Sequence, residues 1–97
     1  MDESKLAQEV DRGRKASVLL SDTIFREAIE ITQQRILDDF ARCEPSNALE
    51  LQKIRLKLQC HADLLREISE VIRTGQLAQV QVTEARSLFD RMRRVRS

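Results

Sequence analysis

Residues 47–75, NALELQKIRLKLQCHADLLREISEVIRTG, decide the fold that the sequence predicts. Apolar residues and one histidine recur here at alternating intervals of three and four, which places them on one helix face as a heptad seam. Ser46 or Asn47 would cap the start of this helix, and Asn47 with Glu50 has the spacing of a capping box. Gly75 is typical of the left-handed residue that follows a helix end. We therefore expect a helix over residues 46–74 with a seam made of Leu51, Ile54, Leu58, His61, Leu65, Ile68 and Ile72.

The preceding segment predicts a second amphipathic helix over residues 21–43. Ser21 is a suitable N-cap, and the apolar positions from Phe25 onward follow one face. This helix should end before Glu44-Pro45-Ser46, because the residue before a proline disfavours helical geometry. The two helices would form a long antiparallel αα-hairpin. Apolar residues occupy more than one face of the longer helix, which favours an oligomer.

Two shorter helices are expected at the ends of the chain. The first covers residues 4–20 and contains Gly13, which weakens it. After a link with a brief extended piece, Thr83 would cap a basic helix over residues 83–96. Phe89 and Met92 share an apolar face of this helix and are, with the seam residues, candidates for contacts between helices or between copies. The predicted fold class is all-α, with residues 1–97 forming a single helical domain.

Composition agrees with a small helical protein that needs a partner. Only two Gly and one Pro interrupt 97 residues, and three Phe are the only aromatic residues. A core of this size is thin, so a second copy or another protein would complete it. Seventeen basic and sixteen acidic residues give a net charge of +1. No apolar run reaches the roughly 20 residues of a membrane span, and the first residues lack the apolar core of a signal peptide, so we expect no membrane partner.

The sequence predicts no catalytic residue, no metal site and no cofactor, and hence no enzyme. His61 is the only histidine and lies in the seam, where a packed and hydrogen-bonded role is expected. Cys43 and Cys60 should both be reduced, because the second lies about 20 Å along its helix and a disulfide needs Cα atoms within about 7 Å. Metal-binding His or Cys motifs and a phosphate-binding glycine loop are absent from the sequence.

The basic C-terminal end is the candidate contact site. From Arg86 to Ser97 the chain has five Arg and one Asp, a net of +4, while the rest sums to −3. These cations can stabilise a helix C-terminus, bind an acidic protein surface, or contact DNA phosphates, and the sequence leaves the three interpretations open. The candidate contact residues are Arg86, Arg91, Arg93, Arg94 and Arg96.

Residues 18–78 carry a resemblance to a known group of proteins. The resemblance is carried by an opening with Leu20, Asp22, Phe25 and Ala28 and by a closing turn with Gly75, Leu77 and Ala78. This segment resembles small helical proteins that tailed bacteriophages and prophages encode near head, portal and packaging genes. Phe40 stands near the place where that group often has a Trp.

The resemblance implies a non-enzymatic structural or assembly protein of a virion, made in the bacterial cytoplasm. It would pack against itself or against larger head, portal or internal proteins. Two alternatives are a small phage or prophage regulator that binds a host protein, and a non-specific nucleic-acid-binding protein that uses the arginines.

Overall fold

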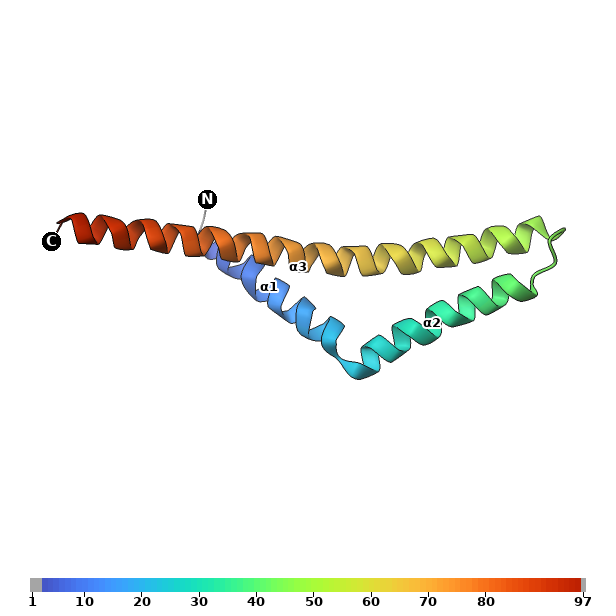
Figure 1. Ribbon diagram of the computed structural model, residues 1–97. Helices are drawn as coiled ribbons and strands as arrows, with labels where there is room; N and C mark the ends of the chain where they lie inside the picture. Colours follow the sequence, from blue (N-terminus) through green and yellow to red (C-terminus); the bar gives the residue numbers. More distant parts are fainter. Residues whose placement is uncertain (1–2, 97) are drawn as a thin grey trace. The chain divides into compact units, whose positions relative to one another are not determined.

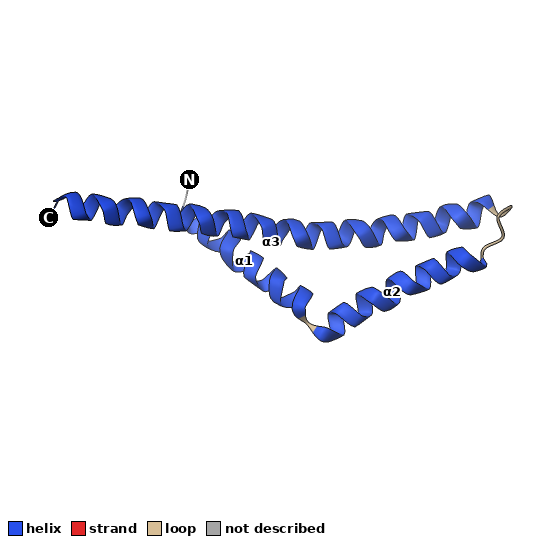
Figure 2. Cartoon of the chain, in the orientation of Figure 1, coloured by secondary structure: helices blue, strands red, loops and turns tan. Residues whose placement is uncertain are grey.

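A computed structural model describes residues 3–96 of the chain, with the side chain of Arg96 outside the description. About 94% of the structure is helical, and no strand occurs among residues 3–96 (Figures 1 and 2). The three helices are α1 (Glu3–Ser21), α2 (Thr23–Arg42) and α3 (Ala48–Arg96). The all-α prediction is confirmed.

The helices form two compact units, which we describe separately. Unit 1 comprises Met1–Ser17 and Ser69–Ser97, and unit 2 comprises Val18–Ile68. Unit 1 has ten basic and seven acidic residues, a net of +3, whereas unit 2 has seven basic and nine acidic residues, a net of −2. Unit 1 is therefore net basic and unit 2 net acidic. The single domain over residues 1–97 stays a prediction.

In unit 2, one residue separates α1 from α2. Asp22 has extended backbone angles (φ −66°, ψ 126°), and its carboxylate accepts a hydrogen bond from the Phe25 backbone N–H at 2.8 Å. The expected N-cap, Ser21, instead lies in the last turn of α1, so that prediction was wrong. Both residue types are good N-caps, but a carboxylate also stabilises the positive end of the helix dipole. Helix α2 therefore begins at Thr23 rather than at residue 21.

The connection between α2 and α3 follows the expected turn. Cys43 is extended (φ −73°, ψ 134°) just before Glu44-Pro45, where proline restricts the chain. Asn47 Oδ1 accepts from the Glu50 backbone N–H at 3.2 Å, so the predicted capping residue is confirmed. The following helix begins at Ala48, two residues later than expected.

In unit 1, α1 and α3 approach each other at the chain's only two glycines. A Cβ atom built on Gly75 would lie 2.8 Å from Gly13 Cα and 2.9 Å from the Glu9 carbonyl oxygen. A Cβ on Gly13 would lie 2.8 Å from Gly75 Cα. These distances are shorter than normal carbon contacts, so only glycine permits this backbone approach. Leu6 and Ala78 are buried in the same unit.

The predicted helix end at Gly75 was therefore wrong. No glycine among the described residues has a positive φ, and α3 continues without interruption to Arg96. The predicted link over residues 76–82 and the separate helix over residues 83–96 are both parts of α3. Thr83 is not an N-cap: its hydroxyl donates to the Gln79 carbonyl at 2.9 Å, a bond within the helix.

Candidate interaction surfaces

The predicted seam is the more covered face of α3, but it is not a closed core. Ile54 is 4% exposed and packs in unit 2, where Ile36 of α2 is also buried. Leu58 is 39% exposed. Ile54 is thus the one seam residue that is buried, Leu58 is exposed, and the others are partly covered. The half-buried members are Leu51, His61, Leu65, Ile68 and Ile72.

His61 is part of the contact between α2 and α3. Its Nε2 lies 3.3 Å from the backbone carbonyl oxygen of Ile29. A carbonyl oxygen only accepts, so the neutral ring must carry its proton on Nε2 and donate to it. The side chain is half-buried and hydrogen-bonded, as the sequence predicts. The described residues contain no group of three or more His, Cys, Asp or Glu side chains placed to hold a metal ion.

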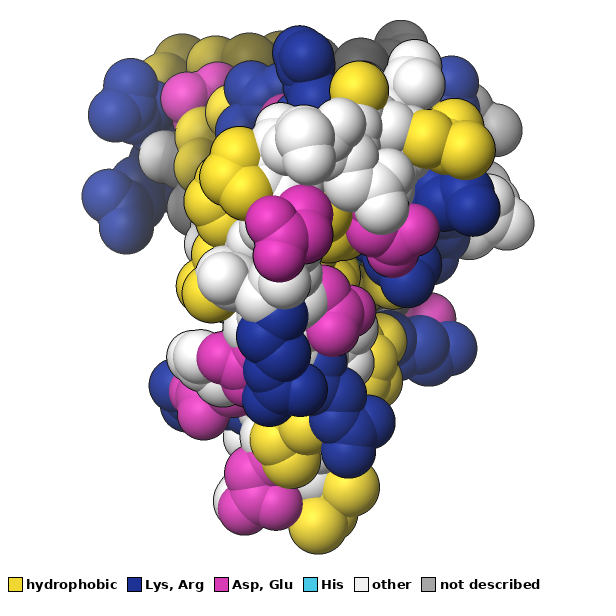
Figure 3. Space-filling view, turned by 90° about the vertical axis from the view of Figure 1, so that its right-hand side faces the viewer, with side chains coloured by type: hydrophobic (Ala, Val, Ile, Leu, Met, Phe, Trp, Pro, Cys, Tyr) yellow, Lys and Arg dark blue, Asp and Glu magenta, His cyan; other side chains and the backbone are white. Residues whose placement is uncertain are grey.

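Large apolar side chains are more often exposed than buried. Sixteen Val, Leu, Ile, Phe or Met residues are exposed among those described, whereas three, Leu6, Ile36 and Ile54, are buried. Figure 3 shows hydrophobic side chains at the surface between charged ones. A small monomer normally covers most such side chains, and large exposed apolar areas mark interaction sites. The described part of the chain therefore leaves more of its large apolar side chains exposed than buried.

Three of these exposed residues lie on the first part of α3, outside the predicted seam. Leu49, Leu56 and Leu64 are 65%, 55% and 60% exposed. Cys60 lies between them in sequence and is an exposed free thiol. Sequence reasoning noted apolar residues on more than one face of this helix but did not single out this second stripe. The signal was present, since these residues also recur at intervals of seven and four.

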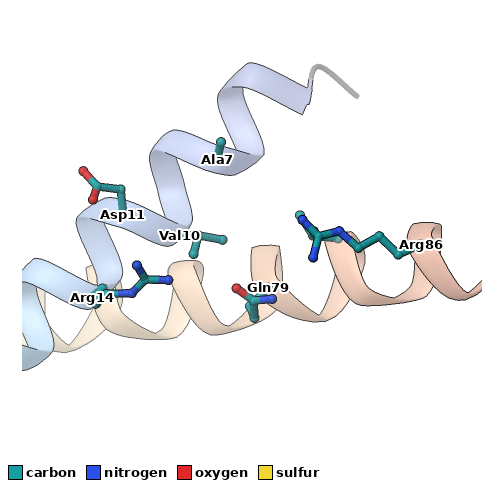
Figure 4. A pocket seen from close by; sticks show the side chains of 7 residues that line it. Ala7, Val10, Asp11, Arg14, Gln79 and Arg86 are labelled. Carbon is teal, nitrogen blue, oxygen red and sulfur yellow. The ribbon is translucent and has the colours of Figure 1, made fainter.

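Unit 1 contains an apolar groove between the start of α1 and the later part of α3. It has a volume of about 640 Å³, and Leu6, Val82 and Phe89 are among its lining residues. A neighbouring hollow of about 390 Å³ lies toward the glycine crossing, with Val10 and Gln79 on facing helices and Asp11 directed away from α3 (Figure 4). Arg86 contributes to both spaces. Phe89 is 60% exposed and Met92 is 52% exposed, so neither is covered by the chain itself.

The candidate arginines do not converge on one point. Arg86, Arg91 and Arg94 line a shallow hollow with Asp90 on one side of α3. Arg93 lies over the Phe89 ring, with its guanidinium carbon 5.4 Å from the ring centroid. This cation–π contact occupies the aromatic face nearest to the basic end. Arg96 falls at the end of α3, and its side chain lies outside the described residues.

Comparisons with known protein families, with characterised proteins and with solved structures return no match. Within residues 3–96, no helix is both long and apolar enough to cross a membrane. Cys43 and Cys60 are both free thiols. The function must therefore be argued from the surfaces described above.

Proposed function

We propose that this chain is a non-enzymatic structural or assembly protein that packs against copies of itself or against larger proteins of a tailed-phage virion. The observation that carries the proposal is the number of large apolar side chains that are exposed, sixteen against three that are buried among the described residues. Fully burying a Leu, Ile or Phe side chain contributes about 1.5–3 kcal/mol. Several such residues together can offset an association cost of about 4–15 kcal/mol.

In this proposal, α2 and the first part of α3 act as an antiparallel αα-hairpin. Support comes from the short connection over residues 43–47, from the His61–Ile29 hydrogen bond, and from the buried pair Ile36 and Ile54. These contacts hold the two helices together while their flanks stay exposed. The virion context is supported by the resemblance over residues 18–78.

The virion proposal is tested by quantitative mass spectrometry of purified particles from the phage or prophage that carries the gene. We expect the chain at a fixed ratio to the major head protein, and the particle-free supernatant serves as the control. Absence from particles, together with accumulation early in infection, would refute the virion role. That result would favour the alternative of a regulator bound to a host protein.

Binding to nucleic acid is a second candidate function, and the +3 charge of unit 1 favours it. The hollow lined by Arg86, Arg91 and Arg94 offers guanidinium groups to phosphates. Since Phe89 is engaged by Arg93, stacking on bases is poorly supported, and any contact should be insensitive to base sequence.

The second candidate is tested by light scattering coupled to size exclusion with short duplex DNA at several salt concentrations. DNA binding should weaken steeply with salt, and the slope of log K against log [salt] should fall by about 0.9 for each phosphate that is no longer neutralised. The test variant carries Gln at Arg91, Arg93, Arg94 and Arg96. A matched control removes four positive charges from unit 2, by Gln at Arg26, Arg35, Arg42 and Arg55. Equal weakening of DNA binding in both variants would rule out a phosphate site at the C-terminal end.

A further inference from the structure

The second stripe on α3 has a regular pattern of its own. It consists of Leu49, Lys53, Leu56, Cys60, Leu64 and Glu67, which we call the outer stripe. Its intervals of four and three keep these residues on one helix face. Cys60 and Leu64 each precede a seam residue, so the stripe is turned by about 100° from the seam that packs in unit 2. All six positions lie in unit 2, and all six side chains are exposed.

Apart from Leu49, the outer stripe is symmetric about Cys60. Leu56 and Leu64 lie four residues on either side of it, and Lys53 and Glu67 lie seven residues on either side. In two identical antiparallel helices related by a two-fold axis at Cys60, each residue before Cys60 faces its counterpart after it on the other copy. Leu56 would then meet Leu64, and Lys53 would meet Glu67.

The charges select this antiparallel arrangement over a parallel one. In a parallel pair, Lys53 would face Lys53 and Glu67 would face Glu67, and both pairs repel. The antiparallel pair makes two opposite-charge contacts instead. Lys57 and Asp63, which lie three residues before and after Cys60, would also meet as opposite charges in the antiparallel pair. Asp63 contacts Arg66 of its own helix at 3.3 Å, and the Asp63 and Arg66 side chains are 50% and 67% exposed.

We propose that a second copy of this chain packs antiparallel on the outer stripe, with the two-fold axis beside Cys60. The inference rests on the proposed assembly function and specifies the self-contact that this function uses. The apolar members gain burial at the centre, and the charged members exclude a parallel alignment. Helix α2 also exposes Ile24 and Ile31, which can extend the contact.

Disulfide cross-linking tests the position of the axis. The full chain with Cys43→Ser keeps only Cys60, and the full chain with Cys60→Ser keeps only Cys43. Mild oxidation should convert the first variant to a covalent dimer, because residues on the axis bring their Cα atoms within about 7 Å. The second variant is the matched control and should stay monomeric on a non-reducing gel. Equal cross-linking of both variants, or none, would overturn the proposed axis.

Charge exchange tests the antiparallel alignment. Lys53→Glu alone and Glu67→Lys alone each create two like-charge contacts in a symmetric dimer, so each should weaken self-association about tenfold. An equimolar mixture of the two variants should recover it, since opposite charges again meet in the mixed dimer. Lys53→Glu paired with Arg55→Glu, a charge reversal outside the stripe, is the control mixture: its mixed dimers keep one like-charge contact and should form less readily than those of the first mixture. Circular dichroism checks that each variant keeps its helix content.

The outcomes separate this inference from the proposed function. A defined oligomer of the wild-type chain that ignores these substitutions would overturn the inference and leave self-assembly through another face. A wild-type chain that is monomeric at all concentrations would overturn the inference as well. Its presence in particles would then leave the proposed function standing, through packing against a larger virion protein.

Discussion

Replacing Gly75 by Ala tests the backbone contact between α1 and α3 in unit 1. The added Cβ would lie 2.8 Å from Gly13 Cα and 2.9 Å from the Glu9 carbonyl oxygen. Both neighbours are backbone atoms, so no side-chain rotation can relieve the clash. The two helix backbones must separate by about 0.6 Å or more to reach an ordinary contact distance of 3.4 Å.

Two effects of opposite sign set the magnitude. Ala in place of Gly in a helix interior stabilises the helix by about 1 kcal/mol. Forcing extra volume into a tight contact costs about 1–3 kcal/mol. We therefore expect Gly75→Ala to lower the free energy of unfolding by about 0–2 kcal/mol, although the same substitution in an open helix would raise it.

Urea denaturation gives the total change, and amide hydrogen exchange shows where it acts. Exchange should accelerate in α1, because it is pushed away from α3, and not in the neighbouring turns of α3. Gln76→Ala is the matched control, since residue 76 is exposed on the same helix and should change stability by less than about 0.5 kcal/mol. A stabilisation of about 1 kcal/mol by Gly75→Ala, with unchanged exchange in α1, would refute the close approach of the two glycines.

Further predictions concern unit 2. Ile54→Ala should lower the free energy of unfolding by about 2–4 kcal/mol in urea, because Ile54 is 4% exposed. Leu64→Ala, at 60% exposure, should cost less than about 0.5 kcal/mol at protein concentrations low enough to keep the chain monomeric, and equal costs for the two variants would contradict the assigned faces. Asp22→Ala should cost about 1 kcal/mol in thermal unfolding, through loss of the cap on the Phe25 N–H, while Asp22→Asn should retain most of the stability. No difference between the two Asp22 variants would show that the cap contributes little.

Periodicity was a reliable guide to the helices because it reports one face of a regular backbone. The intervals of three and four around Ile54 predicted a covered face, and Ile54 is buried. Asn47 and the proline turn were also predictable, since each acts through atoms a few residues away. The choice between Ser21 and Asp22 as N-cap was not, because both residue types satisfy the same backbone N–H groups.

The continuity of α3 could not be predicted from local signals. A glycine can mark either a left-handed helix end or a place where two backbones touch. At Gly75, only the position of Gly13 in the fold distinguishes these two roles. That contact joins residues 62 positions apart in the sequence. The short Val80-Gln81-Val82 alternation suggested an extended link, but three residues are too few to outweigh helix on both sides. The outer stripe was readable from spacing, yet its exposure required the structure.

Exposed apolar side chains also affect the lifetime of the chain in a cell. A copy without its partner presents such residues as Val18, Ile24 and Leu49, which are 67%, 72% and 65% exposed, to chaperones and proteases. The proposed assembly would bury these side chains, so the amount of chain that persists would follow the amount of partner made at the same time. Surplus copies would be degraded or would aggregate. The surface that drives assembly would thereby also set the ratio in which the components accumulate.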